Sequence, residues 1–208
     1  MIRLCFLSPP GSGKGTICKK INETFDIKHF DVGQMLRDRN DESIKKVQAE
    51  GGLVDSKNVL SIFDEALNLD QFVLDGSPRK EAEAIYVLSH PNWLRDPGYL
   101  IKINTPKDVC IERLLKRGRF DDTPEAIEKR FDIFIMETMR SIELFREQGR
   151  LLEVDGNGTP DQIHDEIVQF LKMRMKTEET LKETIGNYHK GFVSEEYFDP
   201  DIFPELKE

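Results

Sequence analysis

The hydrophobic pattern of this chain consists of short apolar runs separated by longer segments with helical periodicity. Four of the runs have the length of a strand, and each is followed by polar or turn-forming residues. These runs are Ile2 to Leu7, Gln71 to Leu74, Tyr99 to Ile103, and Leu151 to Val154. Continuous apolar runs of this length are typical of parallel strands that are buried on both faces.

The segments between the runs place apolar residues three and four positions apart, which indicates helices. In one of them, Val59, Ile62, Phe63 and Ala66 form a single stripe. Helices are expected over Lys14 to Phe25, from about Gly33 through Arg37, Asp41 to Glu50, Ser56 to Leu67, Lys107 to Lys116, Thr123 to Gln148 with or without one break, and Pro160 to Met175. Because strands and helices alternate, we predict an α/β fold with a doubly wound parallel sheet of about five strands.

A polar residue stands directly after each of the four apolar runs. These residues are Ser8, Asp75, Asn104 and Asp155. The carboxyl ends of parallel strands share one edge of the sheet, and ligands bind beyond that edge in doubly wound folds. We therefore expect the functional site to lie there.

Charge and cysteine content narrow the class of protein. The net charge of −9 argues against a nucleic acid polymer or an anionic membrane as partner, because phosphate-rich surfaces repel such a protein. It remains compatible with a small phosphate ligand in a locally basic cleft. Cys5, Cys18 and Cys110 are widely spaced, too few for a four-cysteine zinc site, and typical of reduced thiols in a cytosolic protein. We expect a cytoplasmic location.

The strongest local signal is the segment from Ser8 to Thr16, Ser-Pro-Pro-Gly-Ser-Gly-Lys-Gly-Thr, between the first strand and the first helix. Glycines let successive backbone N–H groups point at one anion, and the helix N-terminus adds partial positive charge. Lys14 supplies a mobile cation for the phosphates, and Thr16 supplies a hydroxyl near a metal ion. This combination predicts a phosphate-binding loop.

The loop resembles that of adenylate kinases and their relatives, in which glycine follows the lysine and threonine comes next. Other segments resemble the same family in the same order along the chain. They are His29 to Arg37, Gly51 to Val54, Asp75 to Arg79, and the arginine-rich region from Arg113 to Arg130. The resemblance covers roughly residues 1 to 172 and implies the P-loop kinase fold, with a small helical insertion that binds a nucleoside monophosphate (NMP).

The resemblance implies phosphoryl transfer from ATP, as co-substrate, to a nucleoside monophosphate, with AMP as the first choice. The catalytic residues that it implies are Lys14, Arg79, Arg119 and Arg130. The ATP-binding residues are Pro10, Gly11, Ser12, Gly13, Lys14, Gly15, Thr16, Arg113, Arg117 and Gly156. The NMP-binding residues are Val32, Gly33, Arg37, Gly52, Val54, Gly76, Arg79, Glu83, Arg119 and Arg130. Thr16 and Asp75 would hold Mg²⁺, largely through water.

The same resemblance sets the expected domain plan. Residues 1–175 form the kinase domain, within which 31–60 are the NMP-binding helices and 117–122 a minimal lid over the donor. Residues 176–208 form an acidic C-terminal extension beyond the family's usual end. The expected partners are small-molecule nucleotides, and the expected state is a monomer.

The sequence departs from the family pattern at several positions. Ser8 replaces the leading glycine of the loop, and Gln34 replaces an aspartate near the metal. The lid is short, because Gly118 alone separates Arg117 from Arg119. At the base-reading positions stand Val32 and Glu83, where AMP-specific relatives have threonine and glutamine.

These departures leave alternatives open. An ionised Glu83 accepts hydrogen bonds only, so it suits the amino groups of adenine or cytosine and the N–H edge of guanine. A UMP/CMP or GMP kinase of the same fold is therefore an alternative to an AMP kinase. A catalytically weak, nucleotide-binding regulatory protein and a P-loop kinase of a non-nucleotide substrate are two more.

Overall fold

The computed structural model describes the backbone of residues 1–192 and the side chains of residues 1–177, 179 and 180. The chain divides into two compact units, Met1–Val168 and Gln169–Glu208. All residues of the expected site lie in the first unit. The boundary expected after residue 175 from the resemblance remains a prediction.

The first unit is built on one five-stranded sheet, and every neighbouring pair of strands is parallel. The strand order is β2-β3-β1-β4-β5. The strands are β1 (Arg3–Phe6), β2 (Lys28–Asp31), β3 (Phe72–Asp75), β4 (Tyr99–Asn104) and β5 (Leu151–Asp155). The expected α/β fold with a doubly wound parallel sheet is confirmed.

Strand β2 has no counterpart among the apolar runs of the sequence. It lies at the edge of the sheet beside β3, and of its four residues only Phe30 is buried. Lys28 is exposed, while His29 and Asp31 are partly covered. A four-residue edge strand with one buried side chain does not produce the continuous apolar run that marks β1, β3 and β4.

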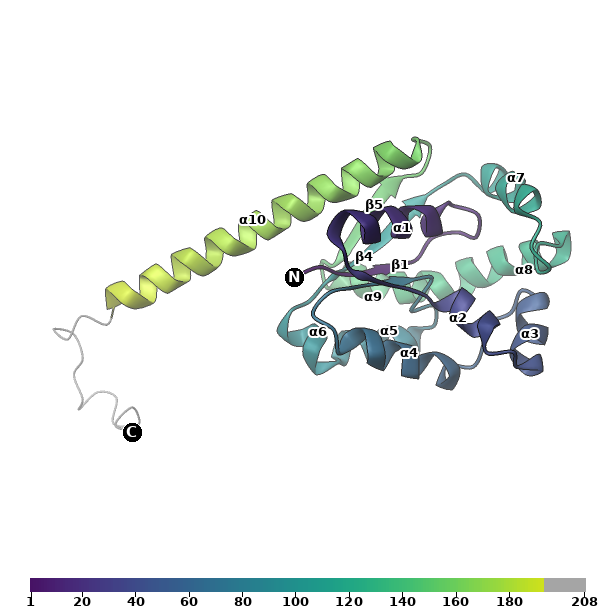
Figure 1. The fold of residues 1–208 in the computed structure, drawn as a ribbon, viewed down its shortest axis with the longest axis horizontal. Coiled ribbons are helices and arrows are strands. Elements are labelled where there is room, and N and C mark those ends of the chain that lie inside the picture. Colours follow the sequence, from purple (N-terminus) through teal and green to yellow (C-terminus); the bar gives the residue numbers. More distant parts are fainter. Residues whose placement is uncertain (193–208) are drawn as a thin grey trace. The chain divides into compact units, whose positions relative to one another are not determined.

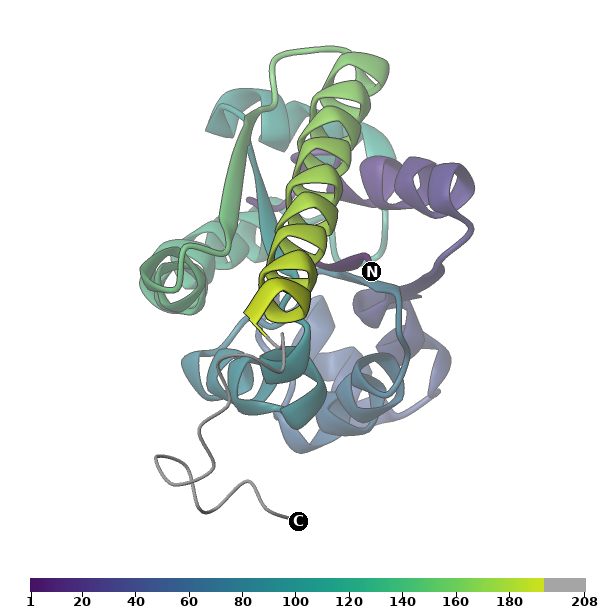
Figure 2. The same ribbon diagram turned by 90° about the vertical axis from the view of Figure 1, so that its left-hand side faces the viewer.

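Helices cover both faces of the sheet, with α1 on one face and α4, α5 and α9 on the other (Figure 1; Figure 2 shows the same arrangement from the side). The helices of the first unit begin and end as follows: α1 Lys14–Phe25, α2 Val32–Asp38, α3 Glu42–Ala49, α4 Lys57–Leu67, α5 Glu81–Ser89, α6 Pro91–Arg95, α7 Lys107–Arg117, α8 Pro124–Ile133 and α9 Met139–Glu147. Helices α5 and α6 have no counterpart among the helix ranges expected from the sequence.

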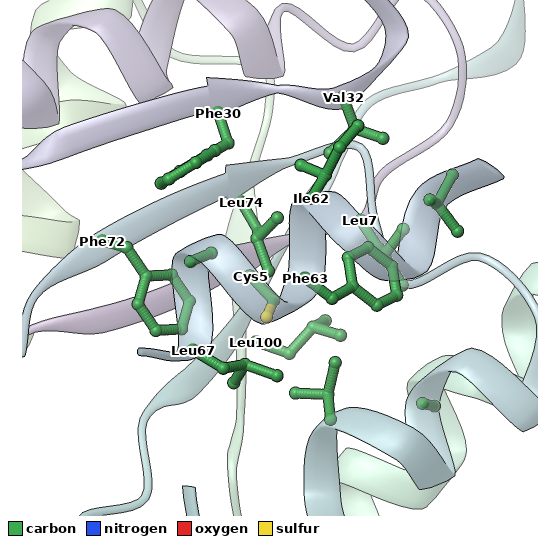
Figure 3. Packing of buried hydrophobic residues seen from close by; sticks show 14 of the residues in the cluster. Cys5, Leu7, Phe30, Val32, Ile62, Phe63, Leu67, Phe72, Leu74 and Leu100 are labelled. Carbon is green, nitrogen blue, oxygen red and sulfur yellow. The ribbon is translucent and has the colours of Figure 1, made fainter. Parts of the chain in front are cut away.

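The main core lies between the sheet and the helices α4, α5 and α9. Phe63 and Leu67 of α4 meet Phe72 and Leu74 of β3 and Cys5 of β1, as Figure 3 shows. A smaller cluster joins α7 to α8 through Cys110, Leu114, Ile127 and Phe131. The main core thus attaches α4, α5 and α9 to the sheet, and the smaller cluster attaches α7 to α8.

The long helical stretch expected from Thr123 to Gln148 contains one irregularity. Helices α8 and α9 are joined by the π-helical turn η1 (Phe134–Thr138). Thr123 caps the start of α8 by accepting a hydrogen bond from the Ala126 backbone N–H, at 3.2 Å. π-Helical turns are frequent at functional sites, and Thr138 of η1 is buried.

Helix α10 runs from Pro160 to Phe192, well beyond the end at Met175 that the sequence pattern predicts. Ile163 and Ile167 at its start are buried. The acidic, aromatic end of the chain, residues 193–208, lies outside the described residues. None of the described helices is long and apolar enough to cross a lipid bilayer.

Candidate active site

The loop between β1 and α1 is bent by two glycines in the left-handed region, Gly11 with φ 87° and Gly13 with φ 89°. A Cβ atom at Gly11 would lie 2.3 Å from the backbone oxygen of Cys110, so no side chain fits between the loop and α7. Lys14 begins α1 directly after Gly13. The local geometry is that of an anion-binding loop feeding a helix N-terminus.

Ser8, which stands where the family has glycine, has a structural role at the start of the loop. Its buried hydroxyl oxygen accepts a hydrogen bond from the backbone N–H of Ile103, at 2.8 Å. This bond continues the pairing of β1 with β4 beyond the Leu7 N–H to Ile101 carbonyl bond, at 3.1 Å. The side chain therefore fixes the loop's first residue to the neighbouring strand.

Asp75 at the end of β3 lies between two basic side chains. Its Oδ1 atom is 3.1 Å from the Nζ atom of Lys14, and its Oδ2 atom is 3.4 Å from Nε2 of His29. The carboxylate is nearly fully buried, at 4% exposure, and burial alone would raise its pKa. Lys14 and His29 outweigh burial and hold the pKa of Asp75 well below its usual range, so the group is a carboxylate.

Arg79 converges with Lys14 on the glycine that follows β3. A Cβ atom at Gly76 would lie 3.2 Å from Nη2 of Arg79 and 3.6 Å from Nζ of Lys14. The Nε atom of Arg79 donates a hydrogen bond to the Gly76 carbonyl oxygen, at 2.7 Å, which aims the guanidinium. Burial lowers the pKa of Arg79, as does the nearby charge of Arg130, whereas Asp75 raises it.

Arg37 on α2 forms the opposite side of the site. Its Nε and Nη2 atoms donate hydrogen bonds to Oε1 of Gln34, at 3.1 and 2.9 Å. Gln34 also donates through Nε2 to Asp38 Oδ1, at 2.7 Å. Burial lowers the pKa of Arg37, and the positive charge of Arg119 lowers it further, which places the two arginines near each other.

Glu83 lines the cleft from the first turn of α5 and is buried. Its Oε1 atom accepts a hydrogen bond from the Ser56 hydroxyl, at 2.8 Å. Its Oε2 atom accepts from the backbone N–H groups of Arg79, at 2.9 Å, and of Lys80, at 3.3 Å. Glu83 thus ties the start of α4 to the chain segment that carries Arg79.

The segment 117–122, which the sequence predicts to be a lid, is organised by one carboxylate. Asp122 accepts two hydrogen bonds from Arg117, at 2.9 and 2.7 Å, and one from Nη2 of Arg130, at 2.8 Å. The backbone N–H of Arg119 donates to the same carboxylate, at 3.1 Å. Burial raises the pKa of Asp122, but these donors together lower it to about 2. The paired Asp121 accepts from Arg130 Nη1, at 3.4 Å.

These elements enclose a single cleft at the carboxyl end of the sheet. Of the site residues expected from the sequence, it is lined by Pro10, Gly11, Lys14, Gly15, Val32, Gly33, Arg37, Gly52, Val54, Asp75, Gly76, Arg79, Glu83, Arg117, Arg119 and Arg130. Its described walls carry six basic side chains (Lys14 and five of these arginines) against four acidic ones (Asp31, Asp75, Glu83 and Asp121). The cleft is therefore locally basic although the chain is acidic, as an anionic ligand requires.

The remaining expected residues, Ser12, Gly13, Thr16, Arg113 and Gly156, do not line this cleft. Nη1 of Arg113 donates a hydrogen bond to the carbonyl oxygen of Ser12, at 3.3 Å, so this arginine contacts the phosphate loop. Gly156 donates its N–H to the Asn104 carbonyl oxygen, at 2.7 Å, and a Cβ there would lie 2.1 Å from Thr105 Oγ1. Thr16 is exposed in the first turn of α1.

Three residues of the site were not identified from the sequence. Ser56 holds Glu83, His29 lies against Asp75, and Thr138 lines the cleft from the π-helical turn. His29 stands in a segment that resembles the family, but its spacing carries no sign of the contact with Asp75. No pattern along the chain marks Ser56 or Thr138, since their partners are brought near only by the fold.

Comparison with known proteins decides which family has this site. A family model described as adenylate kinase matches residues 6–150. The chain belongs to the adenylate kinase family. An adenylate kinase of Xylella fastidiosa is 33% identical over 190 residues, covering 82% of this chain and 99% of the relative. An adenylate kinase of Xanthomonas campestris pv. campestris is 32% identical over 185 residues, with the same coverage.

Another relative is named for other nucleoside monophosphates. A protein named UMP-CMP kinase 1 of Oryza sativa subsp. japonica is 33% identical over 170 residues, covering 76% of this chain and 69% of the relative. Family membership with the adenylate kinases confirms the resemblance drawn from the phosphate loop and from the D-G-S-P-R segment. The identities to the adenylate kinases and to this relative are nearly equal, so they do not select an acceptor base.

Proposed function

We propose that this protein catalyses reversible phosphoryl transfer from ATP to a nucleoside monophosphate, with AMP as the preferred acceptor, so that ATP and AMP give two ADP. The adenylate kinase family supports the ATP-dependent kinase activity. The observation that carries the proposal is the convergence of Lys14 and Arg79 on Gly76, beside the phosphate loop. Two cations at one point beyond a strand end suit two phosphate chains that must approach each other.

Phosphoryl transfer requires the protein to position the two nucleotides and to stabilise the charge of their phosphates. It requires no covalent intermediate with the protein. The loop N–H groups and Lys14 would hold the donor's phosphates, and Arg37 with Arg79 would hold the acceptor's phosphate. Arg119 and Arg130 would stabilise charge on the transferring group. Arginine suits these roles because its planar fork binds phosphate oxygens in pairs and keeps its charge.

The lid residues are partly pre-organised for this role. Asp122 holds Arg117 and Arg130 on adjacent sides of one carboxylate, and Arg130 is close enough to Arg79 to affect its pKa. Fixed arginines need less rearrangement when the phosphates arrive.

The residues at the end of β3 and the start of α1 fit Mg²⁺. Asp75 is a buried carboxylate, and a Cβ atom at Gly15 would lie 3.3 Å from its Oδ2, so the carboxylate borders the loop directly before Thr16. Oxygen ligands of this kind suit Mg²⁺, which keeps most of its waters. Bound Mg²⁺ would neutralise phosphate charge, while Thr16 and Asp75 would hold its water shell.

The acceptor base is proposed to lie between Val32 and Glu83, both of which line the cleft. The Glu83 oxygens already accept three protein hydrogen bonds, and the one remaining lone pair, on Oε1, can accept an amino group of the base. Adenine and cytosine both present such a group. Because the rice relative is named UMP-CMP kinase 1, UMP or CMP is the second candidate acceptor.

A coupled assay of ADP formation with ATP and a panel of AMP, CMP, UMP and GMP tests the proposal. We expect turnover with at least one nucleoside monophosphate and the highest kcat/KM with AMP. Turnover that is highest with CMP or UMP would move the assignment to the second candidate. Nucleotide binding by calorimetry without turnover on any acceptor would replace the kinase with a nucleotide-binding regulatory protein.

A further inference from the structure

Three side chains behind the phosphate loop form a cluster that phosphoryl transfer does not explain. Cys18 comes from α1, His29 from β2 and Asp75 from the end of β3. One potential ligand atom from each, a thiol sulfur, an imidazole nitrogen and a carboxylate oxygen, all lie within 4.8 Å of one another. Cys18 and Asp75 are buried, and His29 is largely covered.

Two polar atoms of this cluster have ion-pair contacts but no well-directed hydrogen bond to any described residue. Nε2 of His29 and Oδ1 of Asp75 are buried, and neither forms a well-directed hydrogen bond within the described part of the chain. Asp75 instead faces Lys14 and His29 at 3.1 and 3.4 Å. Buried polar atoms without directed partners are uncommon and point to an unfilled interaction.

We propose that Cys18, His29 and Asp75 form a binding site for a thiophilic divalent cation such as Zn²⁺, which would inhibit the enzyme. One sulfur, one nitrogen and one oxygen ligand is a donor set that Zn²⁺ accepts and that Mg²⁺ does not favour. A fourth position stays open to water. This site is distinct in chemistry from the proposed Mg²⁺ position, although both use Asp75.

The geometry needs only a small contraction. Zinc ligands lie about 2.0 to 2.3 Å from the metal, so tetrahedral ligand atoms are roughly 3.3 to 3.8 Å apart. The ligand atoms of the cluster are within 4.8 Å, and His29 and Asp75 are already 3.4 Å apart. The Cys18 thiol would transfer its proton to the buffer as the sulfur–metal bond forms.

Inhibition follows from the position of Lys14. Its ammonium group contacts the Asp75 carboxylate that the cation would take, and like charges would drive the side chain away. Asp75 also lines the cleft, which gives the cation an entry path from the nucleotide side. Zinc would therefore displace a lysine assigned to the donor phosphates and occupy the carboxylate assigned to the Mg²⁺ water shell.

Metal binding can be tested without any nucleotide. We would titrate the full-length protein with Zn²⁺ against a chromophoric chelator, and with Co²⁺ to follow thiolate-to-metal charge-transfer absorption. The parent should bind one Zn²⁺ per chain at this site and show the Co²⁺–thiolate band. Cys18→Ser should lose the band, and both Cys18→Ser and His29→Gln should weaken Zn²⁺ binding by about tenfold or more.

The matched control is Cys110→Ser, which removes a buried thiol whose Sγ faces the Thr105 carbonyl oxygen instead. This variant should bind Zn²⁺ as the parent does. Circular dichroism would verify that each variant is folded. Because two ligand variants are used, the test still stands if one of them fails to fold. Equal Zn²⁺ affinity in the parent, Cys18→Ser and His29→Gln, or no thiolate band in the parent, would overturn the site.

Inhibition is then measured as the Zn²⁺ concentration that halves ADP formation, each protein being compared with its own metal-free rate. Cys18→Ser should need at least about tenfold more Zn²⁺ than the parent. Equal sensitivity would refute the inhibitory role while leaving the binding result intact. Because the binding measurement uses no nucleotide, its outcome is independent of the proposed kinase activity.

Discussion

At the scale of single residues, the site is a set of cations held in place by a few buried carboxylates. Asp75 aligns Lys14, Asp122 aligns Arg117 and Arg130, and Glu83 fixes the backbone at Arg79. Each carboxylate is buried, and an unpaired buried charge would be strongly unfavourable, so the pairs are interdependent. Two substitutions separate the roles of a cation and of a carboxylate in this set.

Replacing Lys14 by methionine should abolish phosphoryl transfer while the chain still folds, with a lower melting temperature because the buried Asp75 carboxylate loses one of its two basic partners. The lysine is only partly buried, and its proposed work is on the phosphates of the donor. Turnover and melting temperature should be measured together, with Lys19→Met, an exposed lysine of the same helix, as the control. Turnover retained in Lys14→Met at near the parent rate would remove the phosphate-loop assignment.

Replacing Glu83 by glutamine should raise kcat/KM for AMP relative to CMP and GMP by about tenfold, since ~1.4 kcal/mol corresponds to a factor of ten. Glutamine can keep its amide oxygen on the Arg79 and Lys80 N–H groups and offer an N–H donor to adenine N1, whereas ionised glutamate offers acceptors only. An unmatched buried polar group costs about 1–3 kcal/mol. The control is Glu81→Gln, an exposed glutamate of the same turn. An acceptor profile unchanged from the parent would show that Glu83 only anchors the backbone.

At the scale of elements, the sequence predicted most of the regular parts and missed the irregular ones. Helix α1 begins and ends at Lys14 and Phe25 as predicted, because its start is set by the glycine loop. Strand β2 and the π-helical turn η1 were not predicted, since one is a polar edge strand and the other lies within a continuous helical pattern. The long end of α10 was also missed.

The lid should impose a pH dependence on stability through Asp122. Because the folded pKa is lowered from 3.8 to about 2, Asp122 stabilises the fold above pH 4, and this contribution is lost as pH falls from about 4 to about 2. Asp122→Asn should therefore be less stable than the parent near neutral pH, by about 2 kcal/mol. The difference should shrink toward pH 2.

This prediction is checked by denaturant unfolding of both proteins at several pH values. Asp132→Asn, which alters an exposed acid on α8, serves as the control and should show no comparable pH-dependent difference. A stability gap between the parent and Asp122→Asn that stays constant from pH 7 to pH 2 would contradict the assigned role. The comparison isolates Asp122 because the other titrating groups are common to both proteins.

At the scale of the whole molecule, the fold and most of the cleft could be predicted, and the contacts within the cleft could not. The phosphate loop and the D-G-S-P-R segment carry local signals, so Lys14 and Arg79 were found from the sequence. The bond from Ser8 to Ile103 and the bond from Ser56 to Glu83 join residues 95 and 27 positions apart. Such pairings depend on sheet order and helix docking, which leave no mark on local sequence.

The domain plan predicts that a chain ending at Met175 keeps the activity. Every lining residue of the cleft lies between Leu7 and Thr138, well before that point. We expect kcat and KM within about twofold of the full chain, because no described residue beyond Met175 lines the cleft. Turnover and thermal unfolding should be compared for both lengths. A large loss of turnover with unchanged unfolding would assign residues 176–208 a part in catalysis.

The most direct test of the kinase assignment is the stoichiometry of the reaction, followed by phosphorus NMR. Equimolar ATP and AMP with Mg²⁺ should be converted to ADP, with two ADP formed for each ATP consumed, and ADP alone should regenerate ATP and AMP. Release of inorganic phosphate with AMP unchanged would mean hydrolysis rather than transfer. That result would contradict the proposal that the cations around Gly76 bring two phosphate chains together for transfer, and no change in either nucleotide would contradict AMP as the acceptor.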